Sequence, residues 1–230
     1  MGYDILMRCF NEAEWLEKTY KSIKFQKLKP NKVVFVDSGS DDDSVKLAKK
    51  FNWNVIKYQE KPFNYSKSLN IGMSYSESNL VMILSAHCVL FNEVAASTMI
   101  KEFKDNNIGA VFGRQLPTNK SSPHDIRDLL TVFGRERLVY STHPFFHNAF
   151  SMIRKDCWKI KNFDEKVNGI EDRIWAREIA KLGYSVIYQP NAAAYHEHGL
   201  NHGTSKKRAE RVVKALKVLH KDDYISWPEY

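Results

Sequence analysis

The fold is decided by the stretch VVFVDSGSDDDSVKLAKKF, residues 33–51. Its first five residues, Val33 to Asp37, form an apolar run that ends in a carboxylate and predicts a buried strand. Ser-Gly-Ser follows as a tight turn, after which Ser40 and Asp43 resemble a capping box that opens a helix. A buried strand that turns at once into a helix is the building unit of an α/β sheet.

The same alternation of strand and helix continues on both sides of this unit. Further apolar runs that predict strands lie at residues 3–10, 54–58, 80–84, 110–114, 150–153 and 185–188. Helical patterns lie between them at residues 13–23, 66–76, 93–105, 125–137 and 171–182. We therefore expect an α/β fold with a doubly wound, mostly parallel sheet and a ligand site beyond the carboxyl ends of its strands.

Length and composition fit one domain with a full hydrophobic core. The chain has 230 residues, of which 43% are hydrophobic, and this content argues against intrinsic disorder. Its net charge of +8 predicts an anionic partner. Nucleic acid, an acidic membrane surface and a phosphorylated small substrate all satisfy that charge, so charge alone does not choose among them.

Two features of the sequence predict a cytoplasmic protein. The beginning of the chain lacks the apolar stretch of a signal peptide, and no apolar run is long enough to cross a bilayer. The three cysteines, Cys9, Cys88 and Cys157, are widely spaced and odd in number, so they predict neither a disulfide framework nor a metal pair.

Polar residues follow the predicted strand ends, where an open α/β sheet places its chemistry. Asp37 can accept an N–H of a nucleobase, and the glycine turn after it supplies backbone donors. Imidazoles of His87 and of His196 or His198 can hold a divalent metal ion against a diphosphate. A carboxylate at the start of the helix at 171 can accept a proton from an attacking hydroxyl. The P-loop and dinucleotide fingerprints are missing from the sequence.

Five strings together resemble the family-2 glycosyltransferases of the GT-A fold. They are RCFNE at 8–12, VVFVDSGSDD at 33–42, SLNIGM at 68–73 with LVMILSAHC at 80–88, and EDRIWARE at 171–178. The resemblance runs from Asp4 to about Asn201 and is strongest to the bacterial branch that builds surface polysaccharides, including rhamnosyltransferase-like members. It implies an inverting transfer of a sugar from a nucleoside-diphosphate donor to a hydroxyl of a glycan or lipid-linked acceptor.

The resemblance also implies a role for individual residues. Asp172 matches the general base, with Glu171 beside it, and His196 and His198 match the late His-x-His that completes a Mn²⁺ or Mg²⁺ site with His87. Asn148 matches the acceptor side, where Trp175 is a further candidate. The expected donor-binding residues are Phe10, Asn11, Glu12, Asp37, Ser38, Lys67, Ser85, Ala86, His87, Lys206 and Arg208.

The same resemblance divides the single domain of residues 1–230 into functional parts. We expect residues 1–90 to bind the nucleotide, residues 91–204 to bind the acceptor and carry the catalysis, and residues 205–230 to form a basic helix and tail.

Two departures from the family pattern concern the diphosphate. Ser85-Ala86-His87 stands where the family usually has Asp-x-Asp, and Ser is a poor metal ligand, so a metal ion at this position would depend mainly on His87. Leu69 stands where the family has an arginine before Asn70, which leaves Lys67 as the nearest cation.

Two other classes of protein are alternatives. A nucleotidyltransferase needs a glycine-rich basic loop after the first strand, but residues 11–14 are Asn-Glu-Ala-Glu. A nucleic-acid binder is suggested by the net charge, but the basic residues are scattered and no nucleic-acid motif is present, so no nucleic-acid partner is expected.

The predicted basic amphipathic helix at 205–221 has two interpretations. It can hold the protein at the anionic inner face of the membrane, near a lipid-linked acceptor. Alternatively, its apolar side packs onto the domain and its lysines are solvated.

Overall fold

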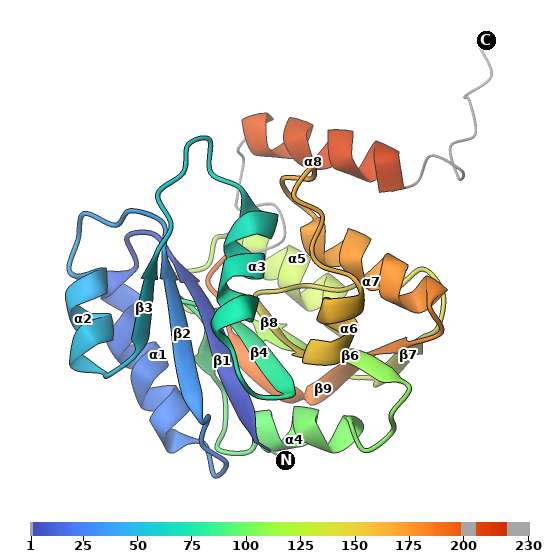
Figure 1. Cartoon of the computed structure of the whole chain (residues 1–230), viewed down its shortest axis with the longest axis horizontal. Helices are drawn as coiled ribbons and strands as arrows, with labels where there is room; N and C mark the ends of the chain where they lie inside the picture. Colours follow the sequence, from blue (N-terminus) through green and yellow to red (C-terminus); the bar gives the residue numbers. More distant parts are fainter. Residues whose placement is uncertain (1, 199–205, 220–230) are drawn as a thin grey trace.

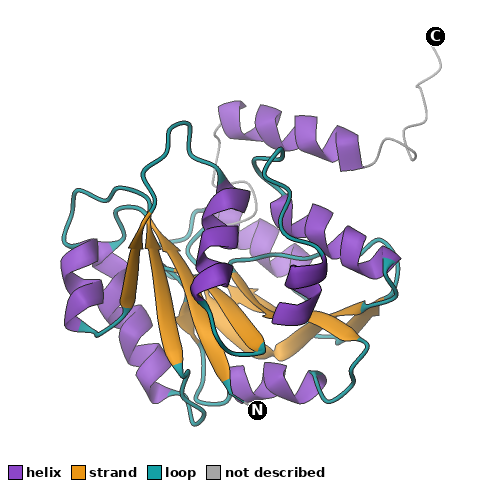
Figure 2. Cartoon of the chain, viewed as in Figure 1, coloured by secondary structure: helices purple, strands orange, loops and turns teal. Residues whose placement is uncertain are grey.

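A mixed sheet forms the centre of the protein (Figures 1 and 2). The structure is a computed structural model, which describes residues 2–198 and 206–219. In these residues the strands form one sheet in the order β3-β2-β1-β4-β8-β6-β9-β5, with β7 paired to β9. The strands are β1 (Tyr3–Cys9), β2 (Lys32–Asp37), β3 (Asn54–Lys57), β4 (Leu80–Ser85), β5 (Val89–Leu90), β6 (Ile108–Leu116), β7 (Leu138–Tyr140), β8 (Phe150–Arg154) and β9 (Ser185–Tyr195).

Helices cover both faces of the sheet, which confirms the predicted doubly wound α/β fold. Two separate clusters of buried side chains fill the two spaces between sheet and helices. One face carries α1 (Ala13–Phe25), α2 (Ser44–Lys50) and α4 (Ala95–Glu102). The other face carries α3 (Tyr65–Tyr75), α5 (Pro123–Val132), α6 (Lys155–Ile160) and α7 (Glu171–Lys181).

The first four strands of the sheet, β3-β2-β1-β4, are parallel and place their carboxyl ends at one edge. Cys9 lies opposite Asp37 in the β1–β2 pair, and Arg8 lies opposite Ser85 in the β1–β4 pair. The chain winds outward in opposite directions from β1 and β4, so their carboxyl ends form the switch point where such sheets bind ligands.

The second half adds antiparallel strands to the parallel core. β8 pairs antiparallel with β4 and with β6, and β6 pairs parallel with β9. The predicted strand at 185–188 continues to Tyr195, because a bulge between Gly113 and Arg114 lets the pairing resume at Ala193. Pro190 at this bulge hides the continuation from a sequence pattern.

One local prediction, the capping box between Ser40 and Asp43, is wrong. Asp43 is the N-cap of α2 but its side chain makes no capping bond, and Ser40 Oγ accepts the backbone N–H of Asn11 instead. Ser40 therefore joins the loops after β1 and β2. Three short elements without a clear pattern, β5, β7 and α6, were not predicted.

Gly72 allows α3 to lie close to the sheet. A Cβ atom at this position would overlap with the side chain of Leu6 on β1. The glycine inside this helix is therefore required by packing.

The last described helix, α8 (Lys206–Leu219), lies across the top of the molecule in Figure 1, beyond the carboxyl edge of the sheet. Arg177 on α7 donates a hydrogen bond to the carbonyl oxygen of Leu219. None of the helices described for this chain is both long and apolar enough to span a membrane.

Candidate active site

A cavity of about 1210 Å³ opens at the carboxyl edge of the sheet. Loops after β1, β2, β3 and β4 supply its wall from the first half of the chain, and residues 147–149, 169–173 and His196 supply the wall from the second half. Val212 and Leu216 of α8 also line it. The ligand site predicted beyond the strand ends therefore corresponds to a real cavity.

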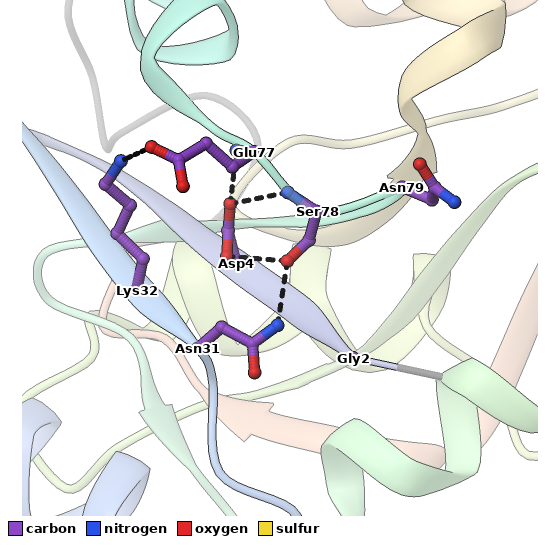
Figure 3. A pocket seen from close by; sticks show the side chains of 7 residues that line it. All are labelled: Gly2, Asp4, Asn31, Lys32, Glu77, Ser78 and Asn79. Carbon is purple, nitrogen blue, oxygen red and sulfur yellow. Dashed lines mark hydrogen bonds and ion pairs between the residues drawn. The ribbon is translucent and has the colours of Figure 1, made fainter.

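A second cavity, of about 680 Å³, lies at the opposite edge of the sheet (Figure 3). Its buried Asp4 carboxylate accepts hydrogen bonds from the backbone of Glu77 and from the backbone and hydroxyl of Ser78. These three bonds satisfy the carboxylate and fix the start of β4, so this cavity has a structural explanation.

Histidines gather at one end of the larger cavity. His87 Nε2 lies 3.0 Å from His196 Nε2 and 3.1 Å from Ser85 Oγ. The rings of His87 and His196 stack with centroids 5.0 Å apart, and the ring of His198 lies edge-on to His87 at 5.4 Å. The structure thus brings together the histidines that the sequence nominates.

Glu12 determines which nitrogen of His87 faces the cluster. Its Oε1 lies 2.7 Å from His87 Nδ1, and a carboxylate accepts hydrogen bonds. Nδ1 therefore carries the proton of the neutral ring, and Nε2 presents its lone pair toward His196 and Ser85. A lone pair in this position can accept a hydrogen bond or bind a metal ion.

The acidic pair Glu171-Asp172 lies at the start of α7 and also lines the cavity. The preceding residue, Ile170, has φ of 58°, a left-handed conformation that is rare for a β-branched residue. Asp172 accepts backbone N–H bonds from Asn148 at 3.0 Å and from Arg173 at 2.8 Å, so its carboxylate is held in one orientation. The left-handed turn at Ile170 and these two bonds together fix the position of the pair at the cavity wall.

Burial changes the acid strength of Glu171. Loss of solvent and the neighbouring Asp172 charge raise the pKa of Glu171 from 4.5 to about 6, although Arg8 acts in the opposite direction. Arg8 Nη1 lies 3.6 Å from the Glu171 carboxylate and 5.1 Å separates its guanidinium from the centroid of the Tyr65 ring. Arg8 thus links β1 to α7 across the cavity.

Asp37 and Asn11, two of the residues predicted to bind the sugar donor, hold the loops together below the cavity. The buried Asp37 carboxylate accepts the backbone N–H groups of Gly39 and Ser40, at 3.1 and 3.2 Å. Asn11 and Asp41 exchange two hydrogen bonds, from Asn11 Nδ2 and from the Asp41 backbone. Neither Asp37 nor Asn11 is among the residues that line the cavity, whereas Ser38 and Asp41 are.

Three further nominated residues do not line the cavity. Trp175 is 1% exposed and donates its indole N–H to Lys161, so its ring has no face for an acceptor. The side chain of Ala86 is buried away from the cavity. Lys67 does not line the cavity either, and its ammonium pairs with Glu60 at 2.6 Å.

Other nominated residues do line the cavity. Phe10 stands at its wall with 58% of its surface exposed, and Ser85 and Asn148 lie deeper in it. Lys206 and Arg208 belong to the first turn of α8, but their side chains lie outside the described residues.

Three residues that the structure places at the site were not among the nominated ones, although Arg8 and Arg173 lie within the strings RCFNE and EDRIWARE. Arg8 and His147 both line the cavity, and Arg173 lines it beside Asp172. His147 directly precedes the nominated Asn148, and this position in the chain is the one signal that pointed toward it. Their roles depend on contacts between residues far apart in the chain.

Fold and cavity together define a GT-A-type domain with an acidic pair and a histidine cluster at its ligand-binding edge. The model of glycosyl transferase family 2 matches residues 4–160. The chain therefore belongs to this family. This membership gives no support to a nucleotidyltransferase or a nucleic-acid binder.

Two curated relatives align with most of this chain at less than 30% identity. The O-antigen chain rhamnosyltransferase WbaN of Salmonella anatum is 27% identical over 81% of this chain and 62% of its own length. The poly-β-1,6-N-acetyl-D-glucosamine synthase of Staphylococcus epidermidis is 24% identical over 84% of this chain and 49% of its own. The chain thus spans from about half to a little under two thirds of the length of these relatives.

A solved structure supports the fold. The mannosyltransferase PcManGT of Pyrobaculum calidifontis, in complex with GDP-Man and Mn²⁺, superposes with a TM-score of 0.71 at 18% identity. The superposition covers 98% of this chain and 66% of the other.

The raised pKa of Glu171 gives a prediction about stability. Between pH 4.5 and about 6 the unfolded chain loses the Glu171 proton before the folded chain does, so the folded state becomes less stable as pH rises through this window. Glu171→Gln cannot ionise and avoids this loss. Urea unfolding from pH 4.5 to 7.5 should show that the stability of the variant relative to the native protein increases up to about pH 6 and then levels off. Glu136→Gln, at an exposed position, is the control; a difference independent of pH for Glu171→Gln would contradict the assignment.

Proposed function

We propose that the chain is an inverting glycosyltransferase that moves a sugar from a nucleoside-diphosphate sugar to a hydroxyl of a glycan or lipid-linked acceptor in polysaccharide synthesis. One observation carries the proposal: an oriented carboxylate and a histidine cluster face the same cavity at the switch point of the sheet. The names of the two relatives, an O-antigen rhamnosyltransferase and a poly-N-acetylglucosamine synthase, support polysaccharide synthesis.

In this proposal residues 1–90 hold the nucleotide. Phe10 and Ser38 line the cavity where the loops after β1 and β2 meet, and they are the candidates for contact with the base and ribose. Asp37 and Asn11 act beneath them by fixing these loops. Residues 91–204 supply the base and the acceptor side, and within residues 205–230 the helix α8 closes the site with Val212 and Leu216.

Asp172 is the proposed general base. It accepts the proton of the acceptor hydroxyl while a bond forms between the acceptor oxygen and the anomeric carbon. The bond from that carbon to the phosphate oxygen breaks at the same time, and the nucleoside diphosphate leaves with its electron pair. The two backbone N–H bonds keep the Asp172 carboxylate aimed at the hydroxyl. Arg8 and Glu171 complete this side of the cavity.

A divalent ion, Mn²⁺ or Mg²⁺, is part of the proposal. His87 Nε2 and His196 Nε2 are 3.0 Å apart, which suits two neighbouring ligands of one ion, and Ser85 Oγ lies beside them. The described residues contain no group of three His, Cys, Asp or Glu that could hold a metal by themselves. These donors therefore fit an ion whose remaining ligands come from the diphosphate. Such an ion would offset the negative charge of the leaving diphosphate.

The first test combines donor binding and turnover. Calorimetry with UDP-GlcNAc, GDP-mannose and a nucleotide-activated rhamnose should reveal one donor that binds. Asp172→Asn should bind that donor normally but lose about 10²–10⁴ in turnover, the usual worth of a positioned base. Asp156→Asn, on the exposed surface of α6, is the control. Near-normal turnover of Asp172→Asn would remove Asp172 from this role, and failure to bind any donor would overturn the proposed function.

The metal prediction concerns binding, so it does not depend on an activity assay. Mn²⁺ added with UDP should raise the melting temperature of the native protein, and His87→Ala should abolish this rise because Ser85 cannot replace the imidazole. His124→Ala, at an exposed position on α5, should respond like the native protein. An equal Mn²⁺ response in His87→Ala would show that the histidine cluster holds no metal.

Contact with an anionic membrane surface at the cytoplasmic face is a further part of the proposal. Val212 and Leu216 line the cavity, so part of the apolar side of α8 faces the domain. Lys214 and Lys217 are exposed, and Val213, next to Lys214 in the chain, is 48% exposed. The exposed parts of these side chains can contact a lipid surface while α8 stays in place.

Liposome co-sedimentation tests this contact. Lysines near an anionic surface contribute about 1 kcal/mol each, so Lys214→Glu with Lys217→Glu should weaken binding to anionic liposomes by more than tenfold at low salt. Lys46→Glu with Lys49→Glu, on α2, is the charge-matched control. Absence of binding to anionic liposomes even at low salt would leave α8 with a structural role only.

A further inference from the structure

His147 and Asn148 lie between the two ends of the cavity. The backbone N–H of Asn148 donates to Asp172 Oδ2 at 3.0 Å, and the ring of His147 faces the ring of His196 with centroids 6.3 Å apart. Both residues line the cavity. If Asp172 is the base and the histidine cluster faces the diphosphate, the transferred sugar has to lie between them, beside this dipeptide.

The hydrogen bonds of His147 define its proton position. Its Nδ1 lies 3.3 Å from the backbone nitrogen of Ala149 and 2.9 Å from Gln115 Nε2. A backbone N–H can only donate, so His147 Nδ1 must accept, whichever way the Gln115 amide is turned. The proton of the neutral ring is therefore on Nε2, which makes this nitrogen a hydrogen-bond donor.

The ring of His147 is also fixed in direction. Gln115 is 1% exposed and holds one edge of the ring, and Phe133 packs edge-to-face against it with centroids 6.1 Å apart. A donor that is fixed in this way can distinguish one position of an oxygen atom from another.

Asn148 adds a second donor. Its side chain is 4% exposed, and its Oδ1 accepts the hydroxyl of Ser151 at 3.2 Å. Its Nδ2 is buried and has no hydrogen-bond partner among the residues that the structure describes. A buried donor without an acceptor is unfavourable, and a ligand oxygen at this point would remove the penalty.

We propose that His147 Nε2–H and Asn148 Nδ2–H bind hydroxyl oxygens of the transferred sugar, and that Gln115 is a positioning residue for the His147 ring. Both donors are uncharged, which suits hydroxyl groups, and they lie where the sugar must be. The inference rests on the proposed function, because it takes its ligand from that reaction. It makes this dipeptide a determinant of which sugar is transferred.

The test compares each nucleotide sugar with its bare nucleotide. Calorimetry gives Kd for UDP-GlcNAc and UDP, for GDP-mannose and GDP, and for dTDP-rhamnose and dTDP, and the pair that binds the native protein is used further. His147→Asn loses the donor at the Nε2 position, so the preference for sugar over bare nucleotide should fall about tenfold. His147→Gln restores an N–H near that position and should lose less than threefold. His124→Asn is the control on the exposed side of α5.

The outcomes separate this inference from the proposed function. An equal loss for the nucleotide and its sugar in His147→Asn, or no loss at all, would overturn the inference while leaving the glycosyltransferase assignment intact. If the native protein bound none of the six ligands, the proposed function would fail and the inference with it.

A spectroscopic measurement tests the role of Gln115 in the native fold. Nitrogen-15 shifts of the His147 ring should show the proton on Nε2 in the native protein. Gln115→Met keeps the Ala149 bond to Nδ1 but frees one edge of the ring, so it should reduce the preference for the sugar, with the affinity for bare nucleotide unchanged. A ring protonated on Nδ1 in the native protein would contradict the argument directly.

Discussion

The antiparallel pairing of β4 with β8 is the contact on which the site depends. In an antiparallel pair, the end of one strand and the start of the other lie at the same edge. Leu84 lies opposite Phe150, and the backbone N–H of Ser85 donates to the carbonyl oxygen of Ala149 at 2.8 Å. The segment that leaves β4 with His87 therefore meets the segment that enters β8 with His147 and Asn148. A parallel pair would have placed these segments at opposite edges of the sheet.

Packing beneath the acidic pair offsets the free-energy cost of holding the pair in place. A left-handed isoleucine and a buried carboxyl both disfavour the folded state. Trp175, one turn further along α7, packs against Phe146 and Phe163 and donates its N–H to Lys161. Its large buried surface anchors the helix that presents the pair. Trp175 therefore stabilises the helix that carries the acidic pair, although it does not line the cavity.

Much of the fold followed from the sequence because buried strands are continuous apolar runs. The positions of β1, β2 and β4 were predicted within a few residues for this reason, and α7 was predicted equally well from its amphipathic pattern. Site residues were harder to predict, because a carboxylate at a strand end serves equally as a ligand contact and as a turn cap. Asp37 illustrates this: its backbone hydrogen bonds could not be inferred from its position. His147 was missed because its surroundings come from Gln115 and His196, which are distant in sequence.

The two interpretations of the basic helix are compatible because they use different sides of it. Residues four apart share a face of a helix, so Val212 and Leu216 can line the cavity together. Lys214 and Lys217 extend into solvent, and the hydrogen bond from Arg177 to Leu219 ties the end of α8 to α7. An amphipathic pattern specifies that an apolar face will be covered, but it does not specify by what. In this chain the cavity wall covers part of that face. In the proposed reaction, an acceptor presented at a membrane would reach the cavity beside this helix.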